Sequence, residues 1–181
     1  MLGGGPALSG QAEARISANT VRFIASFEGF APACYNDPAG HATIGYGHLI
    51  HLGPCTRRDR KAWGTLSPRQ ARQLLRTDLV YYRDQVRERI WKRLPDKVWT
   101  ALISYTYNLG PGYLDFVENR ARRPDTWVAW QFNRGNFRRA ANQMRIYNRA
   151  EIAGKLVVLE GLRRRREAER RLIFEAIGIQ P

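Results

Sequence analysis

Two carboxyl residues flank a glycine-rich bend near the start of the chain. Glu28 follows an apolar helical pattern, and Asp37 lies in an Asn-Asp-Pro-Ala-Gly turn; they are two of the four acidic residues before position 67. The negative end of a helix dipole favours a protonated carboxyl, whereas free turn N–H groups favour an ionised one. An acid and a carboxylate in this relation are what glycosidic-bond cleavage requires. The residues alone leave open a surface Glu and a turn Asp without a catalytic role.

Short elements must hold these two side chains. Ser17 or Asn19 can cap a helix that runs to Glu28, with Gly29 as its stop. From 34 to 52 the helical period is replaced by turn residues, which predicts an antiparallel hairpin or three-stranded sheet with a strand over 42–46. A helical turn is predicted at 59–63.

A long helix follows this small lobe. Ser67-Pro68 is a typical helix start, and six apolar residues then recur at spacings of three or four up to position 90. The aliphatic and aromatic residues that form this stripe are Ala71, Leu75, Leu79, Tyr82, Val86 and Ile90. The stripe predicts a single helix over 67–90 that connects two lobes.

The rest of the chain is predicted to be helical. Residues 98–109 are apolar on two faces, which indicates a central buried helix ending at Gly110. Further helices are predicted at 125–132, 136–148 and 157–177. We therefore expect an α+β fold that is mostly helical, with one small sheet near its start. The domain prediction is a flexible lead-in over 1–15 and one domain over 16–181, divided into a small lobe (16–66), a connecting helix (67–90) and an all-helical lobe (91–181).

The charge of the chain is unevenly distributed. The net charge is +14; residues 1–66 hold six basic and four acidic residues, and residues 67–181 hold 24 and 12. Such a field predicts a polyanionic partner, with nucleic acid, anionic lipid and bacterial wall polymers as options. There is no apolar run long enough to span a membrane, and the start of the sequence lacks signal-peptide features.

Cysteine and histidine cluster around the bend. Cys34 and Cys55 bracket it and are equally compatible with one disulfide or with two free thiols. His41, His48 and His51 lie between them, which raises the alternative of a zinc enzyme such as an amidase. The spacing of His48 and His51 matches no standard zinc pattern, so no metal or other cofactor is expected.

The spacing of the bend residues is more specific than their chemistry. Eight residues separate Glu28 from Asp37, five separate Asp37 from Thr43, and the run from Thr43 to His48 reads T-I-G-Y-G-H. With Gly29, Tyr35 and Gly40 at fixed intervals, this segment resembles the active-site segment of the phage-type lysozymes, the endolysin muramidases of glycoside hydrolase family 24. Residues 101–110 and 161–169 resemble the central and final helices of that family. Residues 147–154 depart from its usual Trp and Gly-Gly.

The resemblance implies a lysozyme-like fold and hydrolysis of the β-1,4 bond between N-acetylmuramic acid and N-acetylglucosamine in peptidoglycan. It implies that Glu28 is the general acid, that Asp37 positions or activates the water and that Thr43 holds this water. Inversion is implied as well, with the carboxyl groups roughly 6.5 to 9.5 Å apart.

Four residues are predicted to bind substrate: Gly47, His48, Tyr107 and Asn108. His48 either braces the hairpin or contacts substrate, and Tyr107 either contacts a sugar or packs in the core.

The alternative from another class is a cationic wall, membrane or nucleic-acid binder without catalysis. Glu167 and Glu169 interleave with the arginines of 163–171, which is typical of a solvated helix face, and no motif for specific nucleic-acid readout is present. The expected partners are peptidoglycan, and anionic wall polymers or outer-membrane lipid for the basic lobe. A monomer is expected, made in the bacterial cytoplasm without a signal peptide and released to the wall by a holin or a secretion machine.

Overall fold

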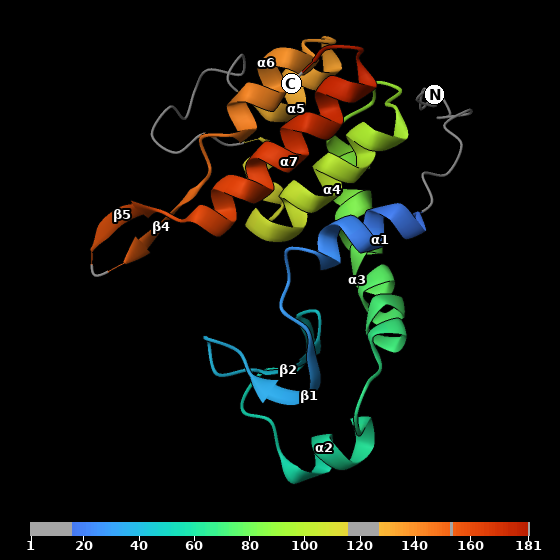
Figure 1. Ribbon diagram of the computed structural model, residues 1–181, viewed down its shortest axis with the longest axis vertical. Coiled ribbons are helices and arrows are strands. Elements are labelled where there is room, and N and C mark those ends of the chain that lie inside the picture. The colour runs from blue at the N-terminus through green and yellow to red at the C-terminus, as the bar shows by residue number, and fades with distance from the viewer. Residues whose placement is uncertain (1–15, 116–126, 153, 181) are drawn as a thin grey trace, which may run out of the picture.

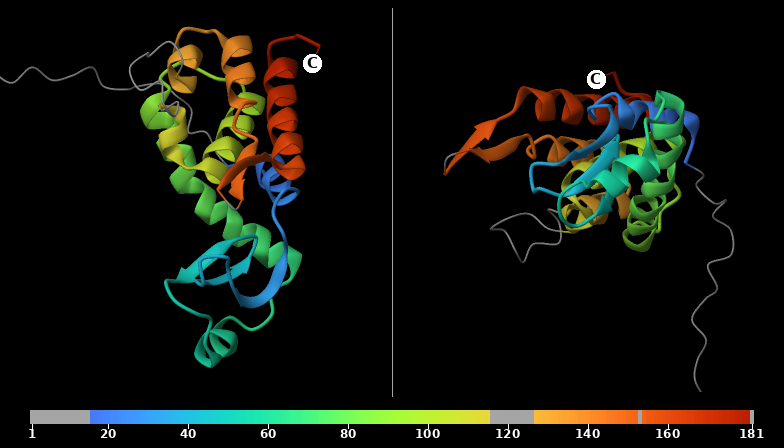
Figure 2. Two further views of the ribbon diagram at one scale, coloured as in Figure 1. Left: turned by 90° about the vertical axis from the view of Figure 1, so that its left-hand side faces the viewer. Right: turned by 90° about the horizontal axis from the view of Figure 1, so that it is seen from below.

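The structure is a computed structural model that describes residues 16–115, 127–152 and 154–180. Two lobes are joined by one long helix (Figures 1 and 2). The lead-in predicted at 1–15 and the start of the helix predicted at 125–132 lie outside the described residues.

The small lobe contains one sheet and one short helix. Strands β1 (Ala31–Asn36), β2 (Ala42–Gly45) and β3 (His48–His51) pair antiparallel in the order β1-β2-β3. Helix α2 (Arg57–Trp63) begins with a capping box between Thr56 and Asp59 and packs against β1. The three-stranded sheet and the helical turn at 59–63 are therefore confirmed.

Helix α1 (Ala18–Ala25) leads into this sheet and is shorter than predicted. The Ser17 side chain accepts the N–H of Thr20, as a capping residue does. The helix ends because Ser26 donates its N–H to the Arg22 carbonyl and its hydroxyl to the Phe23 carbonyl, which satisfies the last turn. Glu28 thus lies three residues beyond the helix, so its predicted place in the last turn, with Gly29 as the stop, was wrong.

Helix α3 (Pro68–Arg89) connects the lobes as predicted. Its first turn is closed by a capping box between Ser67 and Gln70. The predicted stripe faces inward along its length: Ala71, Leu75, Leu79 and Val86 are buried, as is Ile90 just after the helix. Because α3 contacts β2 and β3 at one end and α1 and α4 at the other, it fixes the distance between the lobes.

The large lobe is built around α4 (Asp96–Leu109), whose residues from Val98 to Thr106 are all buried. The other helical elements are η1 (Pro111–Leu114), α5 (Val128–Asn133), α6 (Phe137–Met144) and α7 (Glu160–Ala176). Helix α7 packs along α4 and α6. This confirms the central helix, whereas the helices predicted at 136–148 and 157–177 are shorter than expected.

A second sheet makes the larger lobe less than all-helical, which corrects the prediction. Strands β4 (Arg149–Ile152) and β5 (Lys155–Val158) form an antiparallel hairpin. Gly154 takes a φ of 75° in its turn, and β-branched valines in β5 favour a strand over the helix predicted there. Within the described residues, no helix combines the length and apolar character needed to cross a membrane.

Candidate active site

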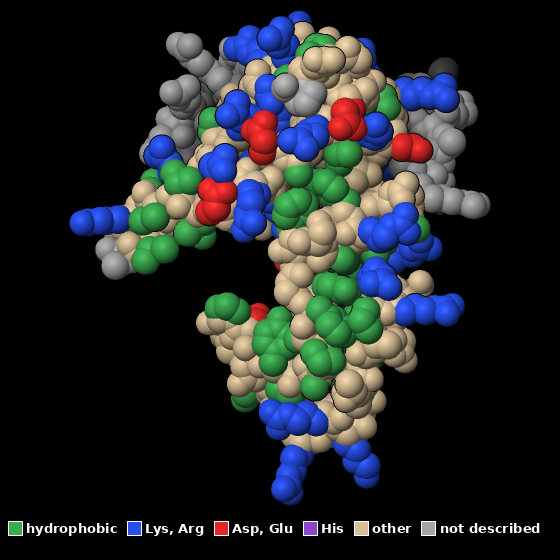
Figure 3. All heavy atoms as spheres, viewed as in Figure 1, with side chains coloured by type: hydrophobic (Ala, Val, Ile, Leu, Met, Phe, Trp, Pro, Cys, Tyr) green, Lys and Arg blue, Asp and Glu red, His purple; other side chains and the backbone are tan. Residues whose placement is uncertain are grey.

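Glu28 lies in the segment that leads from α1 of the helical lobe to β1 of the small lobe. A hollow separates the two lobes in the space-filling view (Figure 3). Its carboxylate accepts a hydrogen bond from the Arg165 guanidinium on α7, with 2.6 Å between Oε1 and Nη1. The Arg165 side chain is 3% exposed and the Glu28 side chain is 24% exposed, so water reaches the pair mainly from the side of Glu28. Glu28 therefore contacts a buried guanidinium, a contact that the helix dipole alone does not predict.

A buried network holds Arg165 in place. Its guanidinium donates to both the hydroxyl and the carbonyl of Ser104 on α4, and it lies 3.4 Å from the Glu169 carboxylate. Glu169 is fully buried and also accepts hydrogen bonds from Ser104 and from Arg166. Burial raises the pKa of the Glu169 carboxyl, while Arg166 and Arg165 oppose this shift.

Asp37 lies in the predicted turn between β1 and β2. Its Oδ1 atom accepts the backbone N–H groups of Ala39 and His41, at 2.9 and 2.8 Å. The turn closes through a hydrogen bond from Gly40 to the Asp37 carbonyl, and Gly40 has a φ of 83°. Two donors on one oxygen orient the carboxylate, as the sequence predicted for a turn residue.

Thr43 is the buried polar residue of the central strand. It is 3% exposed, and its hydroxyl donates to the His41 carbonyl at 3.1 Å. The backbone N–H of His41 also donates to Asp37. Asp37 and Thr43 therefore bind the N–H and the carbonyl of the same residue. The structure thus brings Thr43 and Asp37 to the same turn.

Gly47 and Tyr107 meet where α4 touches the small lobe. The Tyr107 hydroxyl donates to the Tyr46 carbonyl at 2.9 Å, and a β-carbon on Gly47 would come within 3.2 Å of that hydroxyl. Gly47 also has a φ of 89°, which favours glycine. Both residues therefore join the lobes, and their predicted contact with substrate stays a prediction.

Asn108, beside Tyr107, carries a buried amide oxygen with no hydrogen-bond partner in the part of the chain that the structure describes. Buried polar atoms are normally paired, so this unpaired oxygen is an exception among the described residues. Asn108 is one of the four residues predicted to bind substrate, and that role stays a prediction.

The three histidines have structural partners. His48 Nδ1 lies 2.9 Å from Asp78 on α3, and its ring packs against Trp63. His51 lies 3.0 Å from Asp59, and His41 accepts the N–H of Gly53. His48 thus holds the sheet against α3.

Comparison with known proteins identifies the family. The chain matches the Phage lysozyme family over residues 25–169. The chain belongs to the phage lysozyme family. It is 33% identical over 162 residues to an endolysin of Bacillus phage B103, covering 88% of this chain and 54% of the relative. It therefore spans about half the length of that relative.

Similar solved structures support the family assignment. The endolysin from Escherichia coli O157:H7 phage FAHEc1 is 28% identical, with a TM-score of 0.72, and the match covers 95% of this chain and 99% of that one. The muramidase domain of SpmX from Asticaccaulis excentricus is 29% identical, with a TM-score of 0.69, over 87% and 96% of the two chains. The predicted family and fold class are confirmed.

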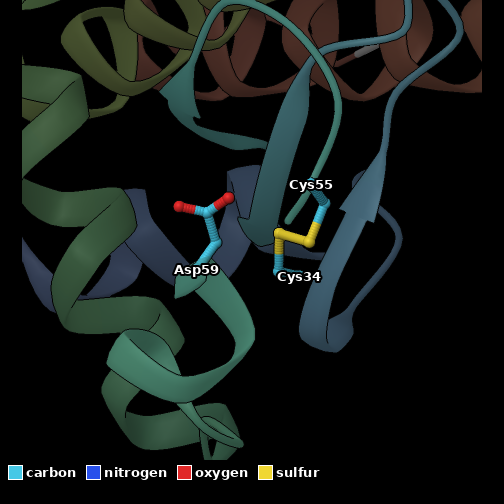
Figure 4. A group of neighbouring side chains, drawn as sticks. All are labelled: Cys34, Cys55 and Asp59. Carbon is cyan, nitrogen blue, oxygen red and sulfur yellow. A yellow bond between two sulfur atoms is a disulfide. The ribbon is translucent and has the colours of Figure 1, made fainter. Parts of the chain in front are cut away.

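The zinc alternative can be examined on this phage lysozyme fold. The metal-ligand cluster found in the described residues is Cys34, Cys55 and Asp59. Cys34 and Cys55 are joined in a disulfide, which decides between the two options that the sequence left open (Figure 4). Hydrogen bonds from Thr56 and His51 lower the pKa of Asp59 to about 2. With both sulfurs bonded to each other, this cluster offers no thiolate to zinc.

Sequence reasoning missed several members of this phage lysozyme site. It did not identify Arg165 as the partner of Glu28, and it did not connect Ser104 or Asp78 with the site. The acidic residues within the arginine run were assigned to a solvated face, yet Glu169 is buried. The spacing of these residues could have indicated this contact, because residues 165, 166 and 169 lie on one face of a helix.

Proposed function

We propose that this protein hydrolyses the β-1,4 bond between N-acetylmuramic acid and N-acetylglucosamine in peptidoglycan, which lyses the bacterial wall. Membership of the phage lysozyme family supports this reaction. The observation that carries the residue assignment is the Glu28–Arg165 pair together with the oriented Asp37 carboxylate. Burial raises the pKa of the Tyr35 phenol, and the charges of Asp37 and Glu28 both raise it further, which supports a short distance between the two carboxyl groups. Two oriented carboxyl groups on separate elements are what a glycosidase needs on the two sides of a sugar.

Glu28 acts as the general acid in this proposal. Arg165 engages its Oε1 atom, which leaves Oε2 to carry the proton that goes to the leaving oxygen. Once the proton has left, the charged carboxylate is stabilised by the guanidinium that it already contacts. The short ion pair therefore assists the step by stabilising the conjugate base of the acid.

Asp37 and Thr43 act on the water. The Asp37 Oδ1 atom is occupied by two backbone donors, so Oδ2 accepts the proton of the attacking water. The Thr43 hydroxyl, which donates to the His41 carbonyl, keeps its own lone pairs for that water. Attack by a water held on the opposite face inverts the anomeric centre.

Substrate contacts follow from the end of α4. The unpaired amide oxygen of Asn108 accepts the N–H of an N-acetyl group, which supplies its missing partner. Tyr107, Gly47 and His48 hold the small lobe at the correct distance for this contact.

The test is Glu28→Gln assayed on purified peptidoglycan, with product analysis for reducing-end N-acetylmuramic acid. Loss of a general acid should reduce turnover by roughly 100- to 10,000-fold. Glu88→Gln, on the exposed face of α3, is the matched control and should retain full activity. Release of peptides instead of reducing sugars, or turnover retained by Glu28→Gln, would refute the assignment. A retained configuration at the new anomeric centre would refute inversion alone.

A zinc amidase predicts a different response. Full wall-lysing activity in excess EDTA is expected for a glycosidase whose chemistry is carried by carboxyl groups. Abolished activity that returns on adding Zn²⁺ would support the amidase and contradict the role of Glu28.

The basic helical lobe serves as the attachment to anionic wall polymers or outer-membrane lipid. Screening by salt should weaken the binding to purified sacculi. A pull-down that is unchanged between low and high salt would contradict this role. We further propose that the protein works as a monomer and reaches the wall from the bacterial cytoplasm through a holin or a secretion machine.

A further inference from the structure

The β4–β5 hairpin stands away from the helical lobe and carries exposed aliphatic side chains. It projects beyond the N-terminal end of α7 in Figure 1 and in the right-hand view of Figure 2. Hydrophobic side chains cover much of its surface in the space-filling view (Figure 3). Twelve large hydrophobic residues are exposed in the described part of the chain, and five of them lie within 146–158: Ile146, Ile152, Leu156, Val157 and Val158. Single exposed aliphatic residues are ordinary, whereas a contiguous group marks contact with an apolar phase.

These aliphatic residues occupy both faces of the hairpin. Cross-strand partners share a face, so the pairing of Leu156 with Glu151 places them together, and the pairing of Val157 with Ala150 defines the other face. Leu156 is 68% exposed and Val157 is 41% exposed. A flat protein surface would cover only one of these faces, whereas a fluid phase can surround both.

Basic residues surround the root of the hairpin. Residues 145–164 include five basic and two acidic residues. The hairpin also bounds a cavity of about 920 Å³, whose charged lining residues are four arginines and two glutamates: Arg145, Arg149, Arg163, Arg166, Glu151 and Glu167. The buried Arg166 keeps two N–H-bearing atoms, Nε and Nη1, without a hydrogen-bond partner in the described residues. Basic side chains that attract anions therefore surround the point where the apolar hairpin leaves the helical lobe.

We propose that the β4–β5 hairpin docks the protein on the surface of an anionic phospholipid bilayer. Its aliphatic side chains enter the boundary between headgroups and acyl chains, and the lipid phosphates face the basic residues around its root. A two-stranded hairpin has unpaired backbone groups at both edges, so it stays in this boundary and does not enter the hydrocarbon core. The proposal narrows the partner proposed above for the basic lobe to lipid and does not depend on the hydrolytic step.

The test is flotation of the full chain with vesicles, at low and high salt. Vesicles of equal parts phosphatidylcholine and phosphatidylglycerol should bind the protein at low salt, and vesicles of phosphatidylcholine alone should bind it much less. Leu156→Ser and Lys155→Gln should each weaken the affinity for anionic vesicles by about tenfold. The matched controls, Leu52→Ser and Lys61→Gln, change equally exposed residues of the small lobe and should bind like the parent chain.

Three outcomes would overturn the proposal. The first is an absence of binding to anionic vesicles at low salt, and the second is equal loss in the hairpin and control variants. The third is a parallel loss of binding to lipid-free sacculi in Leu156→Ser, which would identify a wall polymer as the occupant. Hydrolysis of soluble peptidoglycan fragments should be unchanged in all four variants. A parent chain that binds vesicles but releases no reducing sugar would refute the proposed function and leave this proposal standing.

Discussion

Replacing Arg165 by glutamine tests whether the buried network positions Glu28, the proposed general acid. Arg165 is 3% exposed, contacts Glu28 at 2.6 Å and donates to the carbonyl of Ser104 at 3.0 Å. Glutamine is too short to keep these contacts together, and it removes the positive charge between Glu28 and the buried Glu169. Glu28 and Glu169 then lose the arginine that both of them contact.

The expected magnitude follows from burial. Breaking a buried ion pair on one side costs about 3–5 kcal/mol, and the lower end applies here because Glu169 keeps Arg166 as a partner. With a urea m-value of roughly 2 kcal/mol/M, a loss of about 3 kcal/mol lowers the unfolding midpoint by about 1.5 M. A charge-assisted hydrogen bond is worth roughly 1.5–3 kcal/mol, so kcat should also fall by roughly 10- to 100-fold.

The assay combines urea unfolding, followed by circular dichroism, with turnover on peptidoglycan under conditions where the variant is fully folded. Arg163→Gln is the matched control, because this arginine of the same helix is 57% exposed and pairs with Glu160 at the surface. The control should unfold and turn over like the parent chain. Equal stability losses in the two variants, or full turnover by folded Arg165→Gln, would refute the reasoning.

Three further perturbations test other contacts. Thr43→Val keeps the side-chain shape but removes the hydroxyl, so turnover should fall by about tenfold or more, and loss of the hydrogen bond to the His41 carbonyl should cost about 1 kcal/mol in urea unfolding; normal turnover by the folded variant would contradict the water-holding role. Tyr107→Phe removes the hydrogen bond to Tyr46 and should cost about 1 kcal/mol in urea unfolding. The Leu52 carbonyl and Asp59 raise the pKa of His51 above 6.5; the stabilisation by charged His51 is therefore present below this value and is lost as the pH rises through the raised pKa. Asp59→Asn should lower this pKa only part of the way, because the Leu52 contact remains, and an NMR titration of His51 would measure the change.

Much of the fold was predictable because its long elements carry strong periodic signals. The stripe of α3 and its Ser67-Pro68 start fixed that helix almost to the residue, and the turn residues around Gly40 predicted the sheet. The hairpin at 149–158 was not predicted, because two four-residue strands are too short to show a period and continue an arginine-rich helical pattern.

The candidate site was predictable where its residues are close in sequence. Glu28, Asp37 and Thr43 lie within one short segment whose spacing was enough to nominate them. Arg165 lies 137 residues away from Glu28, and Ser104 lies 61 residues away from Arg165. No local pattern tells which side chains of α4 and α7 meet, so these partners emerged only from the packed helices.

The long separation of these partners also has a consequence for how the site forms. Glu28 belongs to the segment between α1 and β1, yet its ion-pair partner comes from the last helix of the chain. Arg165 is in turn held by Ser104 of the central helix and by Glu169 one turn further along α7. The acid therefore reaches its charged partner only when α7 is packed along α4, and that packing also buries Glu169 and Arg166. Because an unpaired buried charge is costly, the helical lobe must be complete before Glu28 is held for catalysis, and the local motif alone cannot supply activity.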